Sequence, residues 1–226
     1  MNNIVLITGA NRGIGLELSR HYAAQNDQVI AVCRESSDEI ENLAELVISG
    51  IDLTMDESMA TVLQVLKMAH GDDFKIDLLI NNAGLFQSET LSEMDFNQIR
   101  EQFEVNTLAP LKVIHALLPH LKEGSKIANI TSRMGSIEDN TSGSYYGYRA
   151  SKAALNAFAK SLSIDLKPKG ISVAQLHPGF VQTRMVGFNG DLTPEQSAKG
   201  LSQQIEALNL DNSGGFWHSN GEVLPW

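Results

Sequence analysis

Short apolar runs alternate along this chain with segments whose apolar residues recur at helical spacing. The apolar runs predict buried strands at 3–8, 28–33, 47–53, 76–80, 125–130, 171–176 and 215–219. Helical spacing predicts helices at 16–25, 37–46, 56–70, 96–120, 148–167 and 193–208, with a bend or a fresh start at Pro110, and 180–191 is expected to be a loop. Alternating strands and helices predict an α/β fold with a doubly wound, mostly parallel sheet.

Polar and small residues follow several of these predicted strands. In an open parallel sheet, ligands bind beyond the carboxyl ends of the strands. Residues from five different strand ends map to that edge: Gly9, Asp52, Asn82, Ser132 and Pro178. We therefore expect one site there.

A glycine-rich turn joins the first strand to the first helix. Its pattern is Gly9-x-x-x-Gly13-Ile14-Gly15, with Asn11 and Arg12 inside it. Backbone N–H groups and the helix dipole at such a junction attract a pyrophosphate, and glycines let it approach closely. The spacing departs from the common Gly-x-Gly-x-x-Gly fingerprint, and an ordinary tight turn is the alternative.

The end of the second strand bears on which dinucleotide binds. An NAD-binding chain commonly has Asp or Glu there, but this chain has Cys33 and Arg34. Two cations, Arg34 and Arg12, would suit a ribose 2′-phosphate and favour NADP(H). The alternative is that Arg34 is merely solvated and Glu35 contacts the ribose.

Composition narrows the class of protein. The chain has 226 residues, 42% of them hydrophobic, and a formal net charge of -10, with no basic stripe for nucleic acid. Cys33 is the only cysteine, which fits a reducing, cytoplasmic setting. No apolar run is long enough for a membrane span, and we expect no metal site. A soluble enzyme of one domain, 1–226, is the simplest interpretation.

Tyr148 and Lys152 are the main candidates for chemistry. They lie four residues apart at the head of a predicted helix, so their side chains would share one face. An ammonium at ~4 Å in an effective dielectric of ~20 would favour the phenolate by roughly 4 kcal/mol. That interaction would lower the phenol pKa by about 3, to near 7. A solvated helix face is the alternative for this pair alone.

Taken together, the motifs resemble those of classical short-chain dehydrogenases/reductases. The resemblance rests on Thr8-Gly9-x-x-x-Gly13-Ile14-Gly15, Asn81-Asn82-Ala83-Gly84, Ser132, Tyr148-x-x-x-Lys152 and Pro178-Gly179. The stretch Asn140–Tyr148 and the ending Leu224-Pro225-Trp226 are similar to the sniffer-like and C-factor-like carbonyl reductases. The resemblance implies a single-domain Rossmann fold with seven strands in the order 3-2-1-4-5-6-7.

The resemblance also implies a catalytic tetrad of Asn106, Ser132, Tyr148 and Lys152. Tyr148 would protonate the carbonyl oxygen, and Ser132 would hydrogen-bond it. Lys152 would lower the Tyr148 pKa and hold ribose hydroxyls, and Asn106 would position a water beside Lys152. From the residues alone, Asn106 is either a structural clamp or part of a site.

Further cofactor contacts follow from the same resemblance. They would be Asp52 and Leu53 at the adenine, Asn82, Ala83 and Gly84 on the adenosine side, and Pro178, Gly179, Val181 and Thr183 towards the nicotinamide.

Some residues compete with the tetrad for its roles. Tyr145 has Arg149 four residues on, but arginine is a poorer proton relay than lysine. Thr131 and Ser136 are alternatives to Ser132, although Ser132 matches the family pattern better. His177 before Pro178 is expected to be structural.

The substrate wall is expected to be apolar. Met134, Phe180, Met185 and Phe188 fall near the mouth of the site, which suggests a neutral carbonyl compound. The sequence thus predicts an NADPH-dependent carbonyl reductase. The alternatives are a cofactor-binding regulatory protein of C-factor type and an NAD-dependent alcohol dehydrogenase. The resemblance implies a homodimer or homotetramer joined through the helices of Asn106 and Tyr148.

Overall fold

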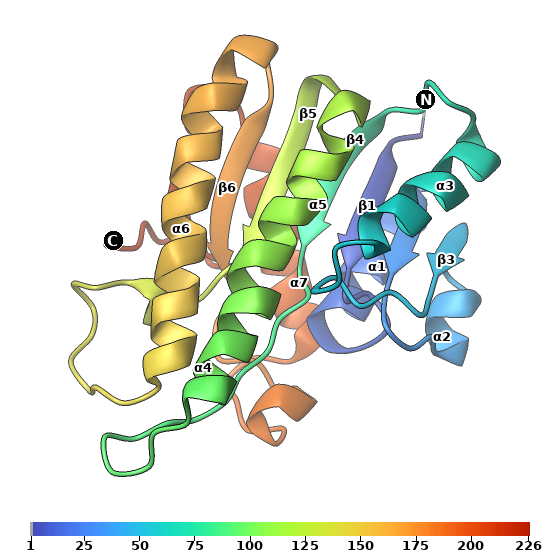
Figure 1. Ribbon diagram of the computed structural model, residues 1–226. Helices are drawn as coiled ribbons and strands as arrows, with labels where there is room; N and C mark the ends of the chain where they lie inside the picture. Colours follow the sequence, from blue (N-terminus) through green and yellow to red (C-terminus); the bar gives the residue numbers. More distant parts are fainter. Residues whose placement is uncertain (1) are drawn as a thin grey trace.

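A seven-stranded sheet forms the centre of the computed structural model, which describes residues 2–226. Its order is β3-β2-β1-β4-β5-β6-β7, and all neighbouring strands are parallel, which confirms the predicted sheet. The strands are β1 (Ile4–Thr8), β2 (Gln28–Val32), β3 (Leu46–Ile48), β4 (Ile76–Asn81), β5 (Leu121–Ile130), β6 (Ser172–His177) and β7 (Phe216–His218). In Figure 1 the strand arrowheads point to one common edge.

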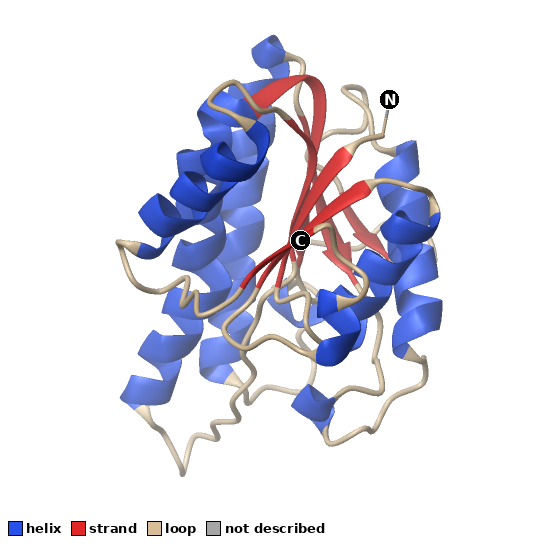
Figure 2. Cartoon of the chain, turned by 90° about the vertical axis from the view of Figure 1, so that its right-hand side faces the viewer, coloured by secondary structure: helices blue, strands red, loops and turns tan. Residues whose placement is uncertain are grey.

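Helices cover both faces of this sheet. They are α1 (Gly13–Ala24), α2 (Asp38–Glu41), α3 (Ser58–His70), α4 (Phe96–Phe103), α5 (Ala109–Leu117), α6 (Tyr146–Leu166) and α7 (Pro194–Ala207). One core joins the sheet to α3, α5 and α6, and a second joins its other face to α1, α2 and α7. Figures 1 and 2 show these two helical layers on either side of the strands.

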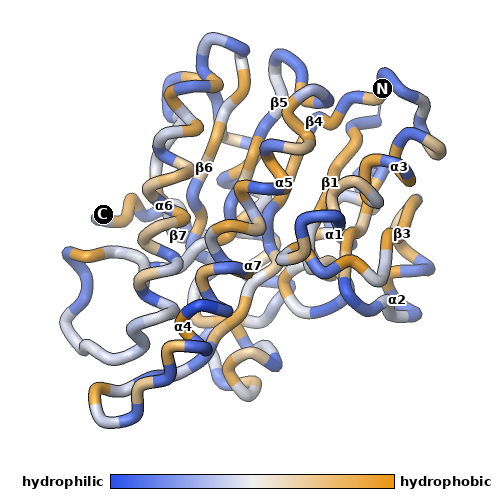
Figure 3. Tube along the Cα trace, in the orientation of Figure 1, coloured by the Kyte–Doolittle hydropathy of each residue, from blue (hydrophilic) through white to orange (hydrophobic). Residues whose placement is uncertain are grey.

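The strands are apolar on both faces because each face is covered. In β1, Leu6 packs into the first core, whereas Val5 and Ile7 pack into the second. Successive side chains of a strand point to opposite faces, so a doubly covered strand needs a continuous apolar run. Figure 3 shows this hydrophobic character along β1.

Two elements are shorter by four residues or more than their patterns predict. Helix α2 has four residues, and β3 has three, against predicted spans of 37–46 and 47–53. Glu45 N–H already bonds to the carbonyl of Val29, so strand pairing begins where a longer helix would continue. Asp52 therefore lies in a turn beyond the end of β3.

The path from α4 to α5 contains a π-helical turn, η1 (Glu104–Leu108). Asn106 is at its centre, four residues before Pro110. Pro110 itself lies in the first turn of α5, directly after η1. The backbone stays helical from α4 through η1 into α5, so no fresh start occurs at Pro110, and the irregularity is the π-turn that precedes it. π-turns inside helices frequently occur at functional sites.

No helix within residues 2–226 has both the length and the apolar character to cross a bilayer.

Candidate active site

The turn between β1 and α1 combines tightly packed glycines with an uncapped helix N-terminus. Gly9 has φ +65°, and a Cβ on Gly15 would lie 2.2 Å from the carbonyl oxygen of Gly9, so no larger residue fits there. Helix α1 has no side-chain cap at its N-terminus and no acidic residue in its first turn. The positive end of the helix dipole is thus uncompensated, as an anion site requires.

Asn82 holds this turn against the end of β4. Its Nδ2 donates to the carbonyl oxygens of Thr8 and Gly9, each at 3.0 Å. The Thr8 hydroxyl in turn accepts from the backbone N–H groups of Asn82 and Ala83, both at 3.1 Å. The polar side chains of Thr8 and Asn82, at the ends of β1 and β4, therefore stabilise the glycine turn. The sequence alone did not decide whether they have this structural role.

Exposed guanidinium groups flank the far end of the turn. The side chains of Arg12 and Arg34 are exposed and make no ion pair with any residue in 2–226. Hydrogen bonds from the Thr54 hydroxyl and backbone N–H lower the pKa of Asp52, and the charge of Arg34 acts in the same direction. Leu53 packs against the first core.

Tyr148 and Lys152 lie on one face of α6, as the spacing predicts, but the pKa of the phenol moves the other way. Burial raises the Tyr148 pKa to about 12, and a hydrogen bond with Ser132 opposes that rise. The Lys152 Nζ is 5.9 Å from the ring centroid and donates to the Ile130 carbonyl at 2.9 Å. Burial lowers the Lys152 pKa to about 8. The expected drop of the Tyr148 pKa to near 7 is therefore wrong, because burial disfavours the charged phenolate.

Ser132 lies directly before the short 3-10 turn η3 (Arg133–Gly135), beside Tyr148. The Ser132 hydroxyl accepts the Met134 N–H at 3.1 Å and caps this turn. A Cβ on Gly135 would lie 2.8 Å from the Lys152 carbonyl carbon. The glycine three residues after Ser132 thus allows η3 to pack directly on α6, beside the phenol.

Asn106 is a fully buried clamp. Its Oδ1 accepts the Leu85 N–H at 2.7 Å, and its Nδ2 donates to the Leu85 carbonyl at 2.7 Å and to the Ser151 hydroxyl at 3.1 Å. Its Oδ1 and the Lys152 Nζ lie 3.4 and 3.7 Å from the same point, where Gly84 would carry a Cβ. The two side chains therefore face one small space at Gly84.

A cleft of about 470 Å³ joins the glycine turn to the phenol. Ile14 of that turn, Ser132 and Tyr148 all line it, together with Pro178, Gly179, Val181 and Thr183. A Cβ on Gly13 would be 3.4 Å from the Thr183 methyl group, so this segment reaches the glycine turn. Phe86, Phe180 and Met185 supply an apolar side.

The competing residues have other partners. The Thr131 hydroxyl donates to Asn156 at 2.7 Å, and the Ser136 hydroxyl donates to the Trp226 carbonyl at 3.1 Å. Arg149 donates to the Ser142 hydroxyl at 2.9 Å and to two backbone carbonyls. Because the hydroxyls of Thr131 and Ser136 already donate to other groups, this geometry favours Ser132 over both of them.

His177 lines the cleft as a neutral side chain. Burial, His218 and Arg133 together lower its pKa to about 3. Its ring packs edge-on against His218, with centroids 4.9 Å apart. A group with this pKa carries no proton to give at neutral pH, which agrees with a structural role.

Sequence reasoning missed the segment that packs against the phenol. The ring of Phe86 meets the ring of Tyr148 edge-on, with centroids 4.9 Å apart and planes at 81°. The buried carboxylate of Glu89, three residues on, accepts from Gln102 and from the Gly147 N–H. No motif marks these residues, because their partners are distant in sequence.

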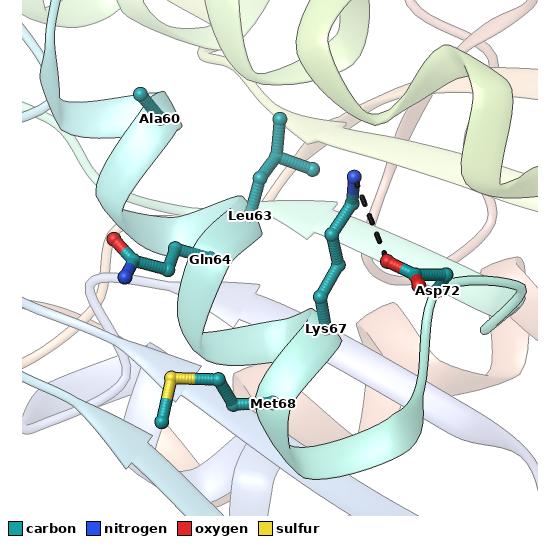
Figure 4. Close-up of a pocket in the computed structure, with 6 residues that line it drawn as sticks. All are labelled: Ala60, Leu63, Gln64, Lys67, Met68 and Asp72. Atoms are coloured by element: carbon teal, nitrogen blue, oxygen red, sulfur yellow. Dashed lines mark ion pairs between the residues drawn. The ribbon is translucent and has the colours of Figure 1, made fainter.

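A second depression, on the outer side of α3, has no comparable chemistry. It is lined by Ala60, Leu63, Gln64, Lys67, Met68 and Asp72 (Figure 4). Its one ion pair joins Lys67 to Asp72 at 3.9 Å, and both side chains are exposed. It shares no residue with the cleft at Tyr148.

Comparison with known proteins places the chain in a family. The family model described as short chain dehydrogenase matches residues 3–195, so the chain belongs to the short-chain dehydrogenases/reductases, as its motifs predicted. It is 38% identical over 226 residues to 1-hydroxy-2-glutathionyl-2-methyl-3-butene dehydrogenase of Rhodococcus sp. (strain AD45), covering 98% of this chain and 99% of the relative. It is 43% identical over 154 residues to the C-signal of Myxococcus xanthus, covering 67% and 93%.

Solved structures of carbonyl reductases align with the whole of this chain. The carbonyl reductase Sniffer of D. melanogaster aligns with a TM-score of 0.90 at 32% identity, covering 100% of both chains. The NADPH-bound carbonyl reductase from chicken fatty liver aligns with a TM-score of 0.89 at 31% identity, covering 100% of this chain and 99% of that one. The predicted resemblance to the sniffer-like and C-factor-like branch is thus confirmed.

Proposed function

We propose that this chain is an NADPH-dependent oxidoreductase that reduces a ketone, aldehyde or quinone carbonyl, and that 1–226 is one dinucleotide-binding domain. One observation carries the proposal: Ile14 of the glycine turn lines the same cleft as Ser132 and Tyr148. A ligand held at the turn can therefore extend to the phenol.

The residues present fit a dinucleotide phosphate. The uncapped first turn of α1 and the tightly packed Gly15 suit its pyrophosphate. The exposed guanidinium groups of Arg12 and Arg34 suit a 2′-phosphate, and NADPH is the ligand named for the chicken carbonyl reductase. Asp52 would meet the adenine, and Asn82, Ala83 and Gly84 the adenosine side. Pro178, Gly179, Val181 and Thr183 would lie towards the nicotinamide.

When bound, NADPH supplies the hydride, and residues of this chain hold and transfer the proton. The phenol of Tyr148, with a pKa of about 12, keeps its proton at neutral pH and donates it to the carbonyl oxygen. The Ser132 hydroxyl hydrogen-bonds that oxygen and stabilises its developing charge. Lys152, with a pKa of about 8, holds a proton at neutral pH and would restore a proton to Tyr148 after the reaction.

Asn106 has a mainly structural role in this scheme. Its amide groups are used by Leu85 and Ser151, so it holds the segment after β4 against α6. A water in the space at Gly84 would meet both Asn106 and Lys152. That water would connect Lys152 to solvent.

The test is a substrate panel with both reduced cofactors. Simple aldehydes, ketones and quinones are assayed with NADPH and with NADH. Turnover with NADPH, at a higher kcat/KM than with NADH, is expected. NADPH binding without any turnover across the panel would favour a regulatory protein instead, a role suggested by the similarity to the C-signal.

The direction of the reaction needs its own assay. The Rhodococcus relative is named a dehydrogenase, so alcohols are assayed with NAD⁺ and NADP⁺ as well. Faster turnover with NAD⁺ and an alcohol than with NADPH and a carbonyl would identify an alcohol dehydrogenase.

We also propose that the protein is a homodimer or homotetramer joined through the helices of Asn106 and Tyr148. Large apolar side chains are exposed on these elements, Phe96 on α4 and Ile164 on α6. Sedimentation of the purified protein tests this, and a monomer at assay concentration would contradict it.

A further inference from the structure

A buried carboxylate, Glu89, lies at the start of the helix that carries Tyr148. Glu89 is 1% exposed and belongs to the segment between β4 and α4. One of its oxygens accepts the Gly147 N–H of α6 at 3.1 Å, and the other accepts from the Gln102 side chain of α4. Burying a carboxylate is costly unless donors satisfy it, and here each oxygen has one.

Helix α6 has no cap from its own sequence. Tyr145 occupies the N-cap position, but its side chain accepts no bond from the helix. The first N–H groups of a helix need acceptors from elsewhere. Glu89 supplies one at Gly147, and its negative charge is favourable at the positive end of the helix dipole.

The backbone that enters α6 is strained. Ser144 and Tyr145 have φ of +53° and +55°, a conformation that side-chain-bearing residues rarely adopt. The Glu89 carbonyl accepts the Tyr145 N–H at 2.8 Å. A Cβ on Gly147 would lie 2.6 Å from the Gln102 Nε2 and 2.9 Å from the Glu89 Oε1, so glycine is required there. Glu89 thus holds the strained turn and caps the helix that follows it.

We propose that Glu89 is a positioning residue for Tyr148. Tyr148 follows Gly147 directly, and its ring packs on Phe86 of the same segment as Glu89. Loosening this first turn would move the phenol relative to Ser132. Misplacing a reacting group by about 1 Å can cost roughly 10²-fold in rate. The effect on rate rests on the proposed function, whereas the capping of α6 does not.

Two variants and a control isolate the role. Glu89→Gln keeps the size and can still accept from Gly147, but its amide then faces the Gln102 amide, donor against donor. The swap Glu89→Gln with Gln102→Glu restores a donor and an acceptor. Its new carboxylate can still accept the Gln87 N–H that Gln102 Oε1 accepts at 2.9 Å. Glu93→Gln, an exposed position on the same segment, is the matched control.

Steady-state kinetics give the first readout. In Glu89→Gln, kcat is expected to fall about tenfold or more, while the Kd for NADPH stays within about twofold. The swap is expected to recover kcat to within about threefold of the wild type, and Glu93→Gln to match it. A wild-type kcat in Glu89→Gln overturns the proposal, and so does a swap no better than the single variant. If Glu89→Gln does not fold, the kcat of the swap variant alone tests the proposal. A kcat within about threefold of the wild type supports it, and a larger loss overturns it.

Amide hydrogen exchange gives a readout that needs no turnover. Exchange at Gly147 to Ser151 is expected to be faster in Glu89→Gln and unchanged in the swap and in Glu93→Gln. Unchanged exchange in Glu89→Gln overturns the proposal. If exchange follows the expected order but even the wild type reduces no carbonyl, the cap stands and the proposed function fails.

Discussion

Replacing Lys152 by methionine is expected to stabilise the protein while abolishing catalysis. Lys152 is 4% exposed, and its ammonium donates to the Ile130 carbonyl at 2.9 Å without a carboxylate partner among residues 2–226. Burial lowers its pKa from 10.5 to about 8. The unfolded chain therefore binds this proton more tightly, and the folded state is penalised at pH below 8. The penalty fades as the pH rises from 8 to 10.5.

The magnitude follows from the gap of about 2.5 between the two pKa values. At about 1.36 kcal/mol for each pKa unit, the penalty is roughly 3 kcal/mol at pH 7, and it falls to roughly 1 kcal/mol at pH 9.5. Methionine has no charge, but it leaves the Ile130 carbonyl without a donor, at a cost of roughly 1–3 kcal/mol at either pH. The stability advantage of Lys152→Met should thus shrink by about 2 kcal/mol between pH 7 and pH 9.5.

Urea unfolding of both proteins at these two pH values measures this difference. Lys160→Met, on the exposed side of the same helix, is the control and should show no such trend. A stability difference between Lys152→Met and the wild type that is the same at both pH values would refute the reasoning. It would mean that Lys152 is no harder to protonate in the folded protein than in the unfolded chain.

Three further predictions concern the cofactor site and the proton path. Arg34→Asp should weaken NADPH binding about tenfold or more and NADH binding much less, measured by fluorescence titration; equal losses would remove the phosphate argument. Gly15→Ala should abolish measurable NADPH binding and destabilise the protein by roughly 1–3 kcal/mol, since its Cβ would meet the Gly9 carbonyl at 2.2 Å; a normal Kd would contradict the turn geometry. The kcat for carbonyl reduction should fall as pH rises through about 8, where Lys152 loses its proton; a flat profile to pH 10 would exclude this lysine from the proton path.

The fold could be predicted because a doubly covered sheet leaves a strong pattern in sequence. Apolar runs and helical spacing locate the seven strands, since each strand must be buried on both faces. The boundaries of α2 and β3 could not be predicted. They depend on where Glu45 begins to pair with Val29, which is a tertiary contact.

The site was predictable where its chemistry depends on spacing along the chain. The four-residue interval of Tyr148 and Lys152 correctly predicts one helix face, but burial, which sets the pKa of both, depends on the rest of the fold. Glu89 could not be found, because its carboxylate meets Gly147 and Gln102 only after three separate segments come together.

Tyr148→Phe tests the central claim most directly, because it removes the phenolic hydroxyl and keeps the ring that packs on Phe86. With NADPH and a carbonyl that the wild type reduces, kcat is expected to fall by about 10³-fold or more, while the Kd for NADPH stays within about threefold. Retained turnover in this variant, with NADPH bound normally, would contradict Tyr148 as the proton donor and with it the proposed mechanism.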